Sequence, residues 1–292
     1  MTISAQIIAD SISPEGIRLT TMQLRYPRFI HAEFMTHRVF SRNASSSRAI
    51  PVERMIKDLR RDPAMPVYWG SNKPGMQAGA ELAGDDLARA KDRWMRGMDD
   101  AIQNASRMID LGLHKQIANR ILEPWAHINT VCTATDWANF FALRAHPDAQ
   151  PEIKVLAEAM LEAMGTTDPV LMEPGQWHLP YVTDEERRDA YHGPSQTSEW
   201  ELLKKVSVAR CARVSYLTHD GRKTTIEEDM ALYEKLLVSQ PLHASPAEHQ
   251  ATPDRVFATH DGEVIWDNPS LHGNFSGWIQ FRKTLPNEFV AG

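Results

Sequence analysis

The segment 36–48 combines arginine, hydroxyl and amide side chains directly after an apolar run, and it reads Thr-His-Arg-Val-Phe-Ser-Arg-Asn-Ala-Ser-Ser-Ser-Arg. Arg38 and Arg48 can grip a phosphate group through their planar guanidinium groups. Ser41, Ser46 and Ser47 add short hydroxyl donors that let the backbone approach the same oxygens. These residues favour an anion-binding site. A solvated, serine-rich turn has the same composition, so the segment alone leaves both interpretations open.

The order of these residues resembles the signature of the flavin-dependent thymidylate synthases, the ThyX family. That signature reads Arg-His-Arg-x-x-Ser-x-Asn-Glu-x-Ser-x-Arg. This chain fills its positions with His37, Arg38, Ser41, Asn43, Ser46 and Arg48. In the family, the first part of the signature holds the flavin and the Ser-x-Arg end holds the nucleotide.

Later segments resemble the C-terminal half of ThyX proteins. Residues 116–120 read Gln-Ile-Ala-Asn-Arg, residues 137–144 read Trp-Ala-Asn-Phe-Phe-Ala-Leu-Arg, and Ala-Gln-Pro-Glu-Ile follows at 149–153. By position, Arg120 and Arg144 correspond to the two arginines that bind the nucleotide in the family. A surface salt bridge is the alternative role for either arginine.

Two further segments resemble the beginning of ordinary ThyX chains, although here they follow the signature. They are Ala-Arg-Val-Ser-Tyr at 212–216 and Ser-Pro-Ala-Glu-His at 245–249. This order indicates a circularly permuted ThyX-like chain, and the termini of compact domains often lie close enough for such a change. We therefore expect one catalytic domain over 1–292. Its parts are a signature and C-terminal-type half (1–164), a linker or surface loop (165–198) and a permuted N-terminal-type segment (199–292).

The resemblance also implies the reaction and the residues that perform it. The reaction is the reductive methylation of dUMP at C5, with FAD as cofactor and with NADPH and 5,10-methylenetetrahydrofolate as co-substrates. The implied flavin-binding residues are His37, Arg38, Ser41, Asn43, Asn139, Ser215 and His249. The implied nucleotide-binding residues are Glu33, Ser46, Ser47, Arg48, Arg120 and Arg144. Of these, Arg144 and Ser46 are the candidates for a direct part in catalysis. For His249 alone, the local pattern favours a half-buried histidine in the first turn of a helix, and only the resemblance favours a contact with the flavin.

Three departures from the family pattern leave other functions open. Thr36 replaces the first arginine of the signature, Ala44 replaces its glutamate, and Glu33 stands where the family usually has glutamine. A carboxylate only accepts hydrogen bonds, so Glu33 suits the amine of cytosine better than the carbonyl of uracil. The alternatives are therefore a dCMP methylase or hydroxymethylase, or an inactive homologue that binds nucleotide or RNA.

Composition limits the partners and the compartment. The 32 lysines and arginines against 38 aspartates and glutamates give a formal net charge of −6, which argues against a broad surface for a nucleic acid polymer. No window approaches about 18 consecutive apolar residues, and no secretory signal precedes the first strand, so we expect a cytoplasmic protein that does not contact a membrane. Relatives in the family form homotetramers. Cys132 and Cys211 form no paired motif, and we expect both to be small buried side chains.

The elements that must position these residues fit the α+β class, a ThyX-like central β-sheet with flanking helices. Strand formers at 5–12 and 17–24, separated by Ser-Pro-Glu-Gly, predict a β-hairpin. Apolar residues spaced by three and four predict an amphipathic helix from 87 to 108. Further helices are predicted at 28–38, 113–122, 137–144, 153–164, 199–210 and 226–237. The last of these begins with a capping box formed by Thr225 and Glu228.

Overall fold

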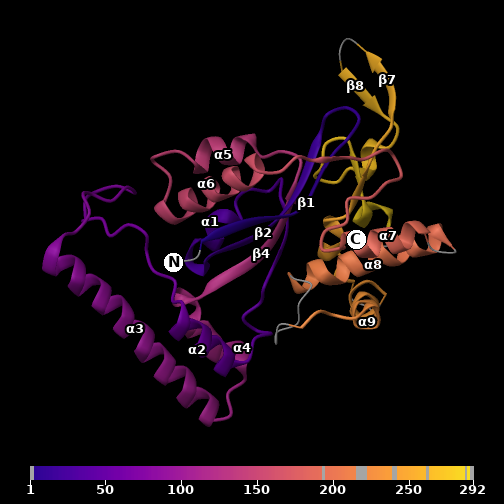
Figure 1. Ribbon diagram of the computed structural model, residues 1–292. Coiled ribbons are helices and arrows are strands. Elements are labelled where there is room, and N and C mark those ends of the chain that lie inside the picture. The colour runs from indigo at the N-terminus through magenta and orange to yellow at the C-terminus, as the bar shows by residue number, and fades with distance from the viewer. Residues whose placement is uncertain are drawn as a thin grey trace.

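A computed structural model describes residues 3–192, 195–214, 222–238, 242–260, 263–286 and 288–289. Its centre is a mixed five-stranded sheet in the order β3-β4-β2-β1-β5, with helices on both faces (Figure 1). The predicted α+β class is therefore confirmed. The two N-terminal strands, β1 (Ser4–Ile12) and β2 (Arg18–Pro27), form the predicted antiparallel hairpin. Gly16 closes its turn at a φ of 79°, which a residue without Cβ adopts at no steric cost.

Strand β4 (His127–Ala134) lies between β2 and β3 and was not predicted. Most of its residues are buried, so its sequence lacks the alternation of polar and apolar residues that marks a half-exposed strand. The signature segment supplies β3 (Ser41–Ala44), which pairs antiparallel with β4. Part of the predicted anion-binding loop is therefore an edge strand. The fifth strand, β5 (Val170–Leu171), runs parallel to β1.

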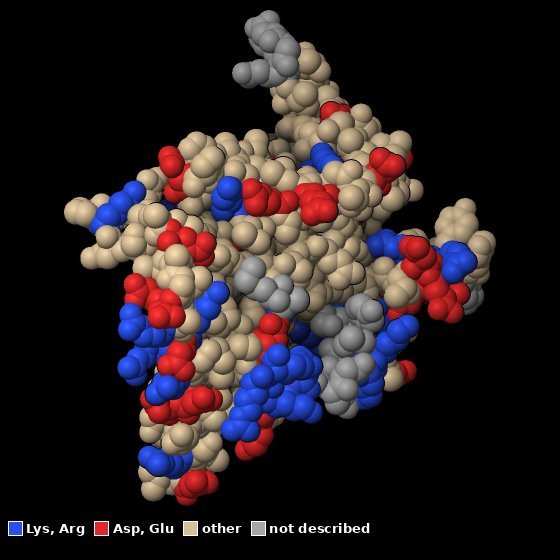
Figure 2. Space-filling view, turned by 60° about the vertical axis from the view of Figure 1, so that its left-hand side comes forward, with Lys and Arg blue, Asp and Glu red and all other residues tan. Residues whose placement is uncertain are grey.

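A long helix, α3 (Gly84–Asp110), confirms the predicted amphipathic helix and extends away from the sheet (Figure 1). Its apolar side packs with α2 (Val52–Arg61), which was not predicted, and with α4 (Lys115–Ala118). Figure 2 shows acidic and basic side chains interspersed over this side of the molecule. The predicted helix at 113–122 is only partly α-helical, because it continues as a 3₁₀ helix, Asn119–Trp125, that contains Pro124. Proline lacks an N–H donor and disfavours α conformation in the residue before it.

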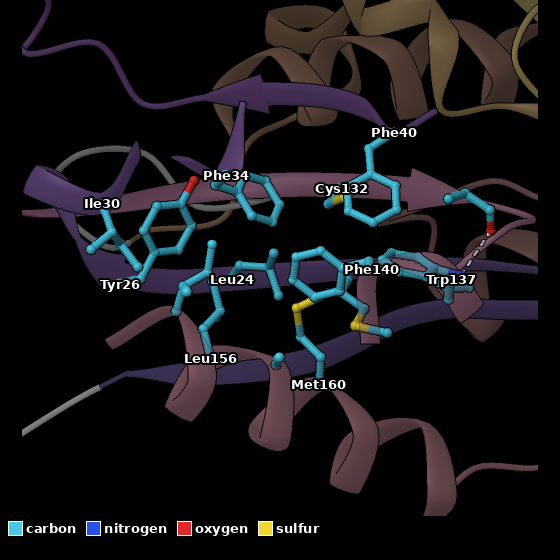
Figure 3. Close-up of a cluster of buried hydrophobic side chains, with 14 of the residues drawn as sticks. Leu24, Tyr26, Ile30, Phe34, Phe40, Cys132, Trp137, Phe140, Leu156 and Met160 are labelled. Atoms are coloured by element: carbon cyan, nitrogen blue, oxygen red, sulfur yellow. Dashed lines mark hydrogen bonds between the residues drawn. The ribbon is translucent and has the colours of Figure 1, made fainter. Parts of the chain in front are cut away.

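One face of the sheet is covered by α5 (Ala138–Arg144) and α6 (Pro151–Gly165), both at predicted positions. Figure 3 shows the aromatic core that results, in which Phe34 lies beside Tyr26, Phe140 lies beside Met160, and Phe40 packs against both phenylalanines. The predicted helix at 28–38 is wrong in length. Its α-helical part, α1, is only His31–Phe34, because Phe34 turns into this core and the chain then bends toward β3.

The expectation of a linker or surface loop at 165–198 is also wrong. This region contains β5 and α7 (Asp184–His192), and Leu179 and Val182 are buried against α8 (Gln196–Arg213). The prolines stop regular elements without keeping the chain at the surface. Helix α9 (Ile226–Leu237) begins with the predicted capping box. Together, α7, α8 and α9 lie on the side of the sheet away from α5 and α6 (Figure 1).

The C-terminal part forms two small sheets. Strand β6 (Ala251–Pro253) pairs with β9 (Trp278–Gln280), and β7 (Val256–His260) pairs with β8 (Glu263–Trp266) in a hairpin that projects from the body (Figure 1). Both cysteines are fully buried, as predicted. Within the described ranges, no helix is long and apolar enough to cross a lipid bilayer.

Candidate functional site

Two residues from distant segments, His37 and Arg144, meet at the end of α5. Nε of Arg144 donates a hydrogen bond to Nε2 of His37 over 2.9 Å. Burial, together with the charges of Arg144 and Arg42, lowers the pKa of His37 below its ordinary value. The imidazole is therefore neutral at pH 7, as it must be to accept at Nε2. This hydrogen bond joins the signature, whose first part the resemblance assigns to the flavin, to the later Leu-Arg segment, which the resemblance assigns to the nucleotide.

The residue that replaces the first arginine of the signature belongs to the same cluster. Thr36 donates from Oγ1 to the carbonyl oxygen of Glu33 over 2.7 Å, and it accepts a longer contact of 3.4 Å from Nη2 of Arg144. Thr36 thus closes α1 and lies beside Arg144. Oε2 of Glu33 is buried and has no hydrogen-bond partner within the part of the chain that the structure describes. A buried carboxylate oxygen without a partner is costly, and a ligand donor would satisfy it.

The end of the signature docks onto the 3₁₀ helix Asn119–Trp125. Oε1 of Glu123 accepts from Oγ of Ser47 at 2.6 Å and from Nη1 of Arg120 at 2.9 Å. Asn119 donates to the carbonyl oxygen of Ser47 at 2.7 Å and so fixes the same turn. The hydroxyl of Ser47 and part of the Arg120 guanidinium are therefore engaged within the protein. Arg120 remains 51% exposed, and its pairing is the surface salt bridge that the sequence left open.

Ser46 and Arg48, by contrast, lie at the surface of this turn. Oγ of Ser46 accepts a hydrogen bond of 3.3 Å from the amide of Arg48, which leaves its own proton available. The guanidinium of Arg48 is exposed. These two residues, more than Ser47, have donors free to contact a ligand.

A cavity of about 580 Å³ opens beside the first half of the signature. One wall consists of Arg38, Phe40 and Arg42, and the other consists of Glu248 with residues between 269 and 283. Arg38 is exposed, whereas Arg42 is half-buried and donates to the carbonyl oxygen of Phe34 over 3.2 Å. Arg42 was not among the predicted site residues.

Two amide side chains join the walls of this cavity. Asn274 donates from Nδ2 to the carbonyl oxygen of Val39 at 2.7 Å and accepts at Oδ1 from Oγ of Ser41 at 3.1 Å. Gln280 donates to Oδ1 of Asn274 at 2.8 Å and to the carbonyl oxygen of Glu248 at 3.2 Å. Ser41 is fully buried by these contacts, so its hydroxyl holds the loop in place and is not open to a ligand.

The other predicted flavin residues that the structure describes lie on separate elements. Asn43 lies on β3 opposite Val131 and is half-buried, and Asn139 is exposed in the first turn of α5. Ser215 lies outside the described residues. His249 follows a single 3₁₀ turn, Ser245–Glu248, and is fully buried, so the half-buried helical alternative is wrong. The turn is short because His249 leads directly into β6.

His249 ends a buried chain of hydrogen bonds that crosses the sheet. His178 joins Oγ of Ser11 through Nδ1 and Oγ1 of Thr21 through Nε2, each at 2.8 Å. Thr21 joins Thr133 at 2.7 Å, and Thr133 joins Nδ1 of His249 at 2.8 Å. Nε2 of His249 is buried without a hydrogen-bond partner among the described residues. Burial lowers the pKa of each histidine to about 3, so both are neutral at pH 7.

This buried chain of hydrogen bonds predicts that the protein loses stability in mild acid. Above the ordinary histidine pKa of 6.5, His178 and His249 are neutral in the folded and unfolded states, and their contribution to stability is complete. Below it the unfolded chain binds protons first, so the free energy of unfolding falls as the pH approaches the folded value of about 3. Urea unfolding should show a decrease of more than about 1 kcal/mol between pH 7 and 5.

The matched variants are His178→Gln, which removes one titrating group, and His146→Gln at an exposed site. The first should flatten the pH dependence and the second should leave it unchanged. A free energy of unfolding that stays constant from pH 7 to 5 would contradict the buried neutral pair.

Four residues that shape the site were not among the predicted site residues: Arg42, Glu123, Asn274 and Gln280. Glu123 could have been found, because it stands three residues after Arg120 on a helical segment. Arg42 occupies a variable position within the signature. The two amides are more than 230 residues from their partners in the signature segment, and no local pattern connects them to it.

Comparison with known proteins identifies the family of this chain. Residues 17–170, just over half of the 292-residue chain, match the family described as thymidylate synthase complementing protein. No curated protein matches the chain. Among solved structures, the UMP/dUMP methylase PolB from Streptomyces cacaoi bound with 5-Br UMP is 20% identical, with a TM-score of 0.46, and the match covers 58% of this chain and 90% of that chain. Its complex with 5-Br dUMP gives 19% identity and a TM-score of 0.46 over 58% of this chain and 91% of that chain.

Because the family match includes the signature, Arg120 and Arg144 and spans more than half of the chain, this protein belongs to the thymidylate synthase complementing proteins, the ThyX family.

Proposed function

We propose that this protein methylates a pyrimidine nucleotide at C5, with dUMP as the substrate and dTMP as the product. The observation that carries the proposal is the hydrogen bond of 2.9 Å between Arg144 and His37. It joins the flavin part of the signature to the segment whose arginine binds nucleotide in the family. Membership of the ThyX family supports the same class of reaction.

The nucleotide side of the site uses groups that are free to donate. Arg144 is oriented by its bonds to His37 and Thr36, and Nη1 of its guanidinium remains to polarise a pyrimidine carbonyl. Arg48 and the hydroxyl of Ser46 lie at the surface of the adjoining turn and suit the phosphate group. The protein's own contribution is to bind and orient the base and to stabilise charge on its carbonyl oxygen.

FAD fits the chemistry of the first half of the signature. Arg38 and Arg42 line a cavity and make no ion pair with any described residue, so an anionic cofactor would balance them. On this proposal His37, Arg38 and Asn43 hold the flavin, and His249 offers an unpaired Nε2 close to β4. When bound, FAD carries the one-carbon unit from 5,10-methylenetetrahydrofolate and supplies electrons drawn from NADPH. We also propose the homotetrameric assembly that the resemblance implies.

The packing of the Ser-Pro-Ala-Glu-His segment supports a circular permutation. Gln280 links the carbonyl oxygen of Glu248 to Oγ of Ser41, and His249 contacts Thr133 on β4. The segment that precedes the signature in ordinary relatives therefore packs against it here, although it comes about 200 residues later. We propose that residues 199–292 replace the usual N-terminal part.

Glu33 favours a second candidate, methylation or hydroxymethylation of dCMP. Its buried Oε2 lacks a partner among the described residues, and only a donor such as the cytosine amine satisfies an ionised carboxylate. Uracil offers a carbonyl at that position and would leave the oxygen unpaired unless the carboxyl group were protonated.

Release of tritium from nucleotides labelled at C5 tests both candidates. Purified protein with FAD, NADPH and methylenetetrahydrofolate should release tritium from dUMP, and Glu33→Gln should keep or increase this rate. Release of tritium from dCMP alone would show that dCMP, and not dUMP, is the substrate. Rapid release from dUMP with none from dCMP would exclude the dCMP candidate. A colourless protein that cannot be loaded with FAD and releases no tritium would point to an inactive nucleotide-binding homologue.

A further inference from the structure

The buried chain of hydrogen bonds that crosses the sheet joins two histidines that the family match does not contain. The match ends at residue 170, whereas His178 and His249 come later in the sequence. The backbone of His178 pairs with that of Ala251, two residues after His249, and its ring nitrogens contact Ser11 on β1 and Thr21 on β2. His178 is fully buried and is therefore held from three directions.

The end of this chain at Ser11 sets the direction of its hydrogen bonds. A hydroxyl group carries one proton. The Ser11 side chain is buried, and among the described residues its hydroxyl makes one hydrogen bond, of 2.8 Å, with Nδ1 of His178. If Nδ1 carried a proton, the proton of Ser11 would be buried without an acceptor, which is costly. Ser11 therefore donates, and His178 is the neutral tautomer with its proton on Nε2.

The direction set at His178 passes through two threonines to His249. Nε2 of His178 donates to Oγ1 of Thr21, so the proton of Thr21 is directed to Thr133 at 2.7 Å. The proton of Thr133 is then directed to Nδ1 of His249 at 2.8 Å. Burial keeps the ring of His249 neutral at pH 7, because it lowers the pKa to about 3. Since Nδ1 accepts, the proton of His249 is on Nε2, which has no hydrogen-bond partner among the described residues.

We infer that His178, together with Ser11, is a positioning residue that fixes His249 as a neutral N–H donor, with Nε2 directed to an acceptor atom of a ligand. A carbonyl oxygen, an unprotonated ring nitrogen or a phosphoryl oxygen can accept this hydrogen bond, whereas an amine or a protonated ring nitrogen cannot. A ligand acceptor also satisfies a buried donor that is costly to leave unpaired. The identity of this ligand as FAD rests on the proposed function, but the tautomer of His249 does not.

Nitrogen NMR of the full-length, flavin-free protein tests the inference. Histidine labelled with the heavy isotope of nitrogen is used, because the protonated and unprotonated nitrogens of a neutral imidazole resonate far apart. The signals of each ring are identified by their loss in His178→Gln and His249→Gln. Both rings should carry a proton on Nε2 alone at pH 7. A proton on Nδ1 of either ring would overturn the inference.

Ser11→Ala tests whether the end of the chain sets its direction. Without the Ser11 hydroxyl, the reversed chain no longer leaves a serine proton unpaired, so about one tenth or more of His249 should carry its proton on Nδ1. Ser13→Ala is the matched control, because Ser13 is equally buried near the turn of the same hairpin and its hydroxyl accepts from the amide of Ile17. The control should leave the His249 signals unchanged. A single Nε2–H tautomer in Ser11→Ala would refute the positioning role of Ser11 and His178.

Addition of FAD separates this inference from the proposed function. On saturation with FAD, the Nε2–H signal of His249 should shift, and the signals of the exposed His146 should not. A protein with the expected tautomers that does not bind FAD would refute the proposed function and leave the tautomer of His249 in place. A protein that binds FAD while His249 carries its proton on Nδ1 would refute the inference alone. FAD binding without a shift at Nε2 would overturn the assignment of the acceptor to FAD.

Discussion

Replacing Arg144 by glutamine is expected to lower the turnover number for pyrimidine C5 methylation by about a hundredfold or more. Its Nε donates to His37, and this bond fixes the direction of the remaining guanidinium donors. Glutamine is shorter and neutral, so it neither reaches His37 in the same way nor stabilises negative charge on the pyrimidine carbonyl. Arg144→Lys keeps the charge but loses the fork, and it should also be strongly impaired.

Steady-state kinetics with dUMP measure this effect, and Arg96→Gln on the exposed side of α3 is the matched control. A loss in turnover with a smaller change in KM would show that Arg144 acts mainly in the transition state. If Arg144→Gln retained turnover within threefold of the unmodified protein, the catalytic assignment would be wrong. Normal flavin absorbance in the variant would separate lost catalysis from lost cofactor.

Replacing Asp229 by alanine is expected to reduce the free energy of unfolding by about 3–5 kcal/mol. Asp229 is fully buried at the start of α9, where its carboxylate accepts from Nε of Arg210 at 2.8 Å and also pairs with Arg213. Arg210 is itself 4% exposed. Removing the carboxylate therefore leaves buried positive charge that Glu186 compensates only in part.

Urea unfolding at pH 7 measures this change, and Asp86→Ala provides the control. Asp86 pairs with Arg89 on α3, but both side chains are mostly exposed, so its removal should cost less than about 1 kcal/mol. Equal stabilities of the two variants would contradict a structural role for the buried ion pairs. The result also bears on the proposed circular permutation, because Arg213 lies in the Ala-Arg-Val-Ser segment and pairs with Asp229.

The parts of the fold that could be predicted were those with a local pattern. The N-terminal hairpin followed from strand formers around a Pro and Gly turn, and α3 followed from apolar residues at helical spacing. Strand β4 could not be recognised, because a strand buried on both faces has no alternation. The segment 165–198 was misread because its prolines mark interruptions of secondary structure, whereas the burial of Leu179 and Val182 depends on contacts with α8.

The site residues that could be predicted were those that a single local motif identifies. His37 and Arg144 were both assigned from their own motifs, and the structure brings them into contact. The sequence could not show that the hydroxyl of Ser41 is bonded to Asn274, because that hydrogen bond joins residues 233 positions apart. It also could not show that Ser47 is held by Glu123. Long-range contacts of this kind decide which hydroxyls face a ligand and which hold the loop.

The mass of the nucleotide product tests the proposed function most directly. Full-length protein loaded with FAD is incubated with dUMP, NADPH and 5,10-methylenetetrahydrofolate, and the nucleotide is analysed by mass spectrometry. The proposed function predicts a product heavier than dUMP by one methylene unit, and its formation should depend on both FAD and the folate. Unchanged dUMP, from a folded protein that carries flavin, would contradict it.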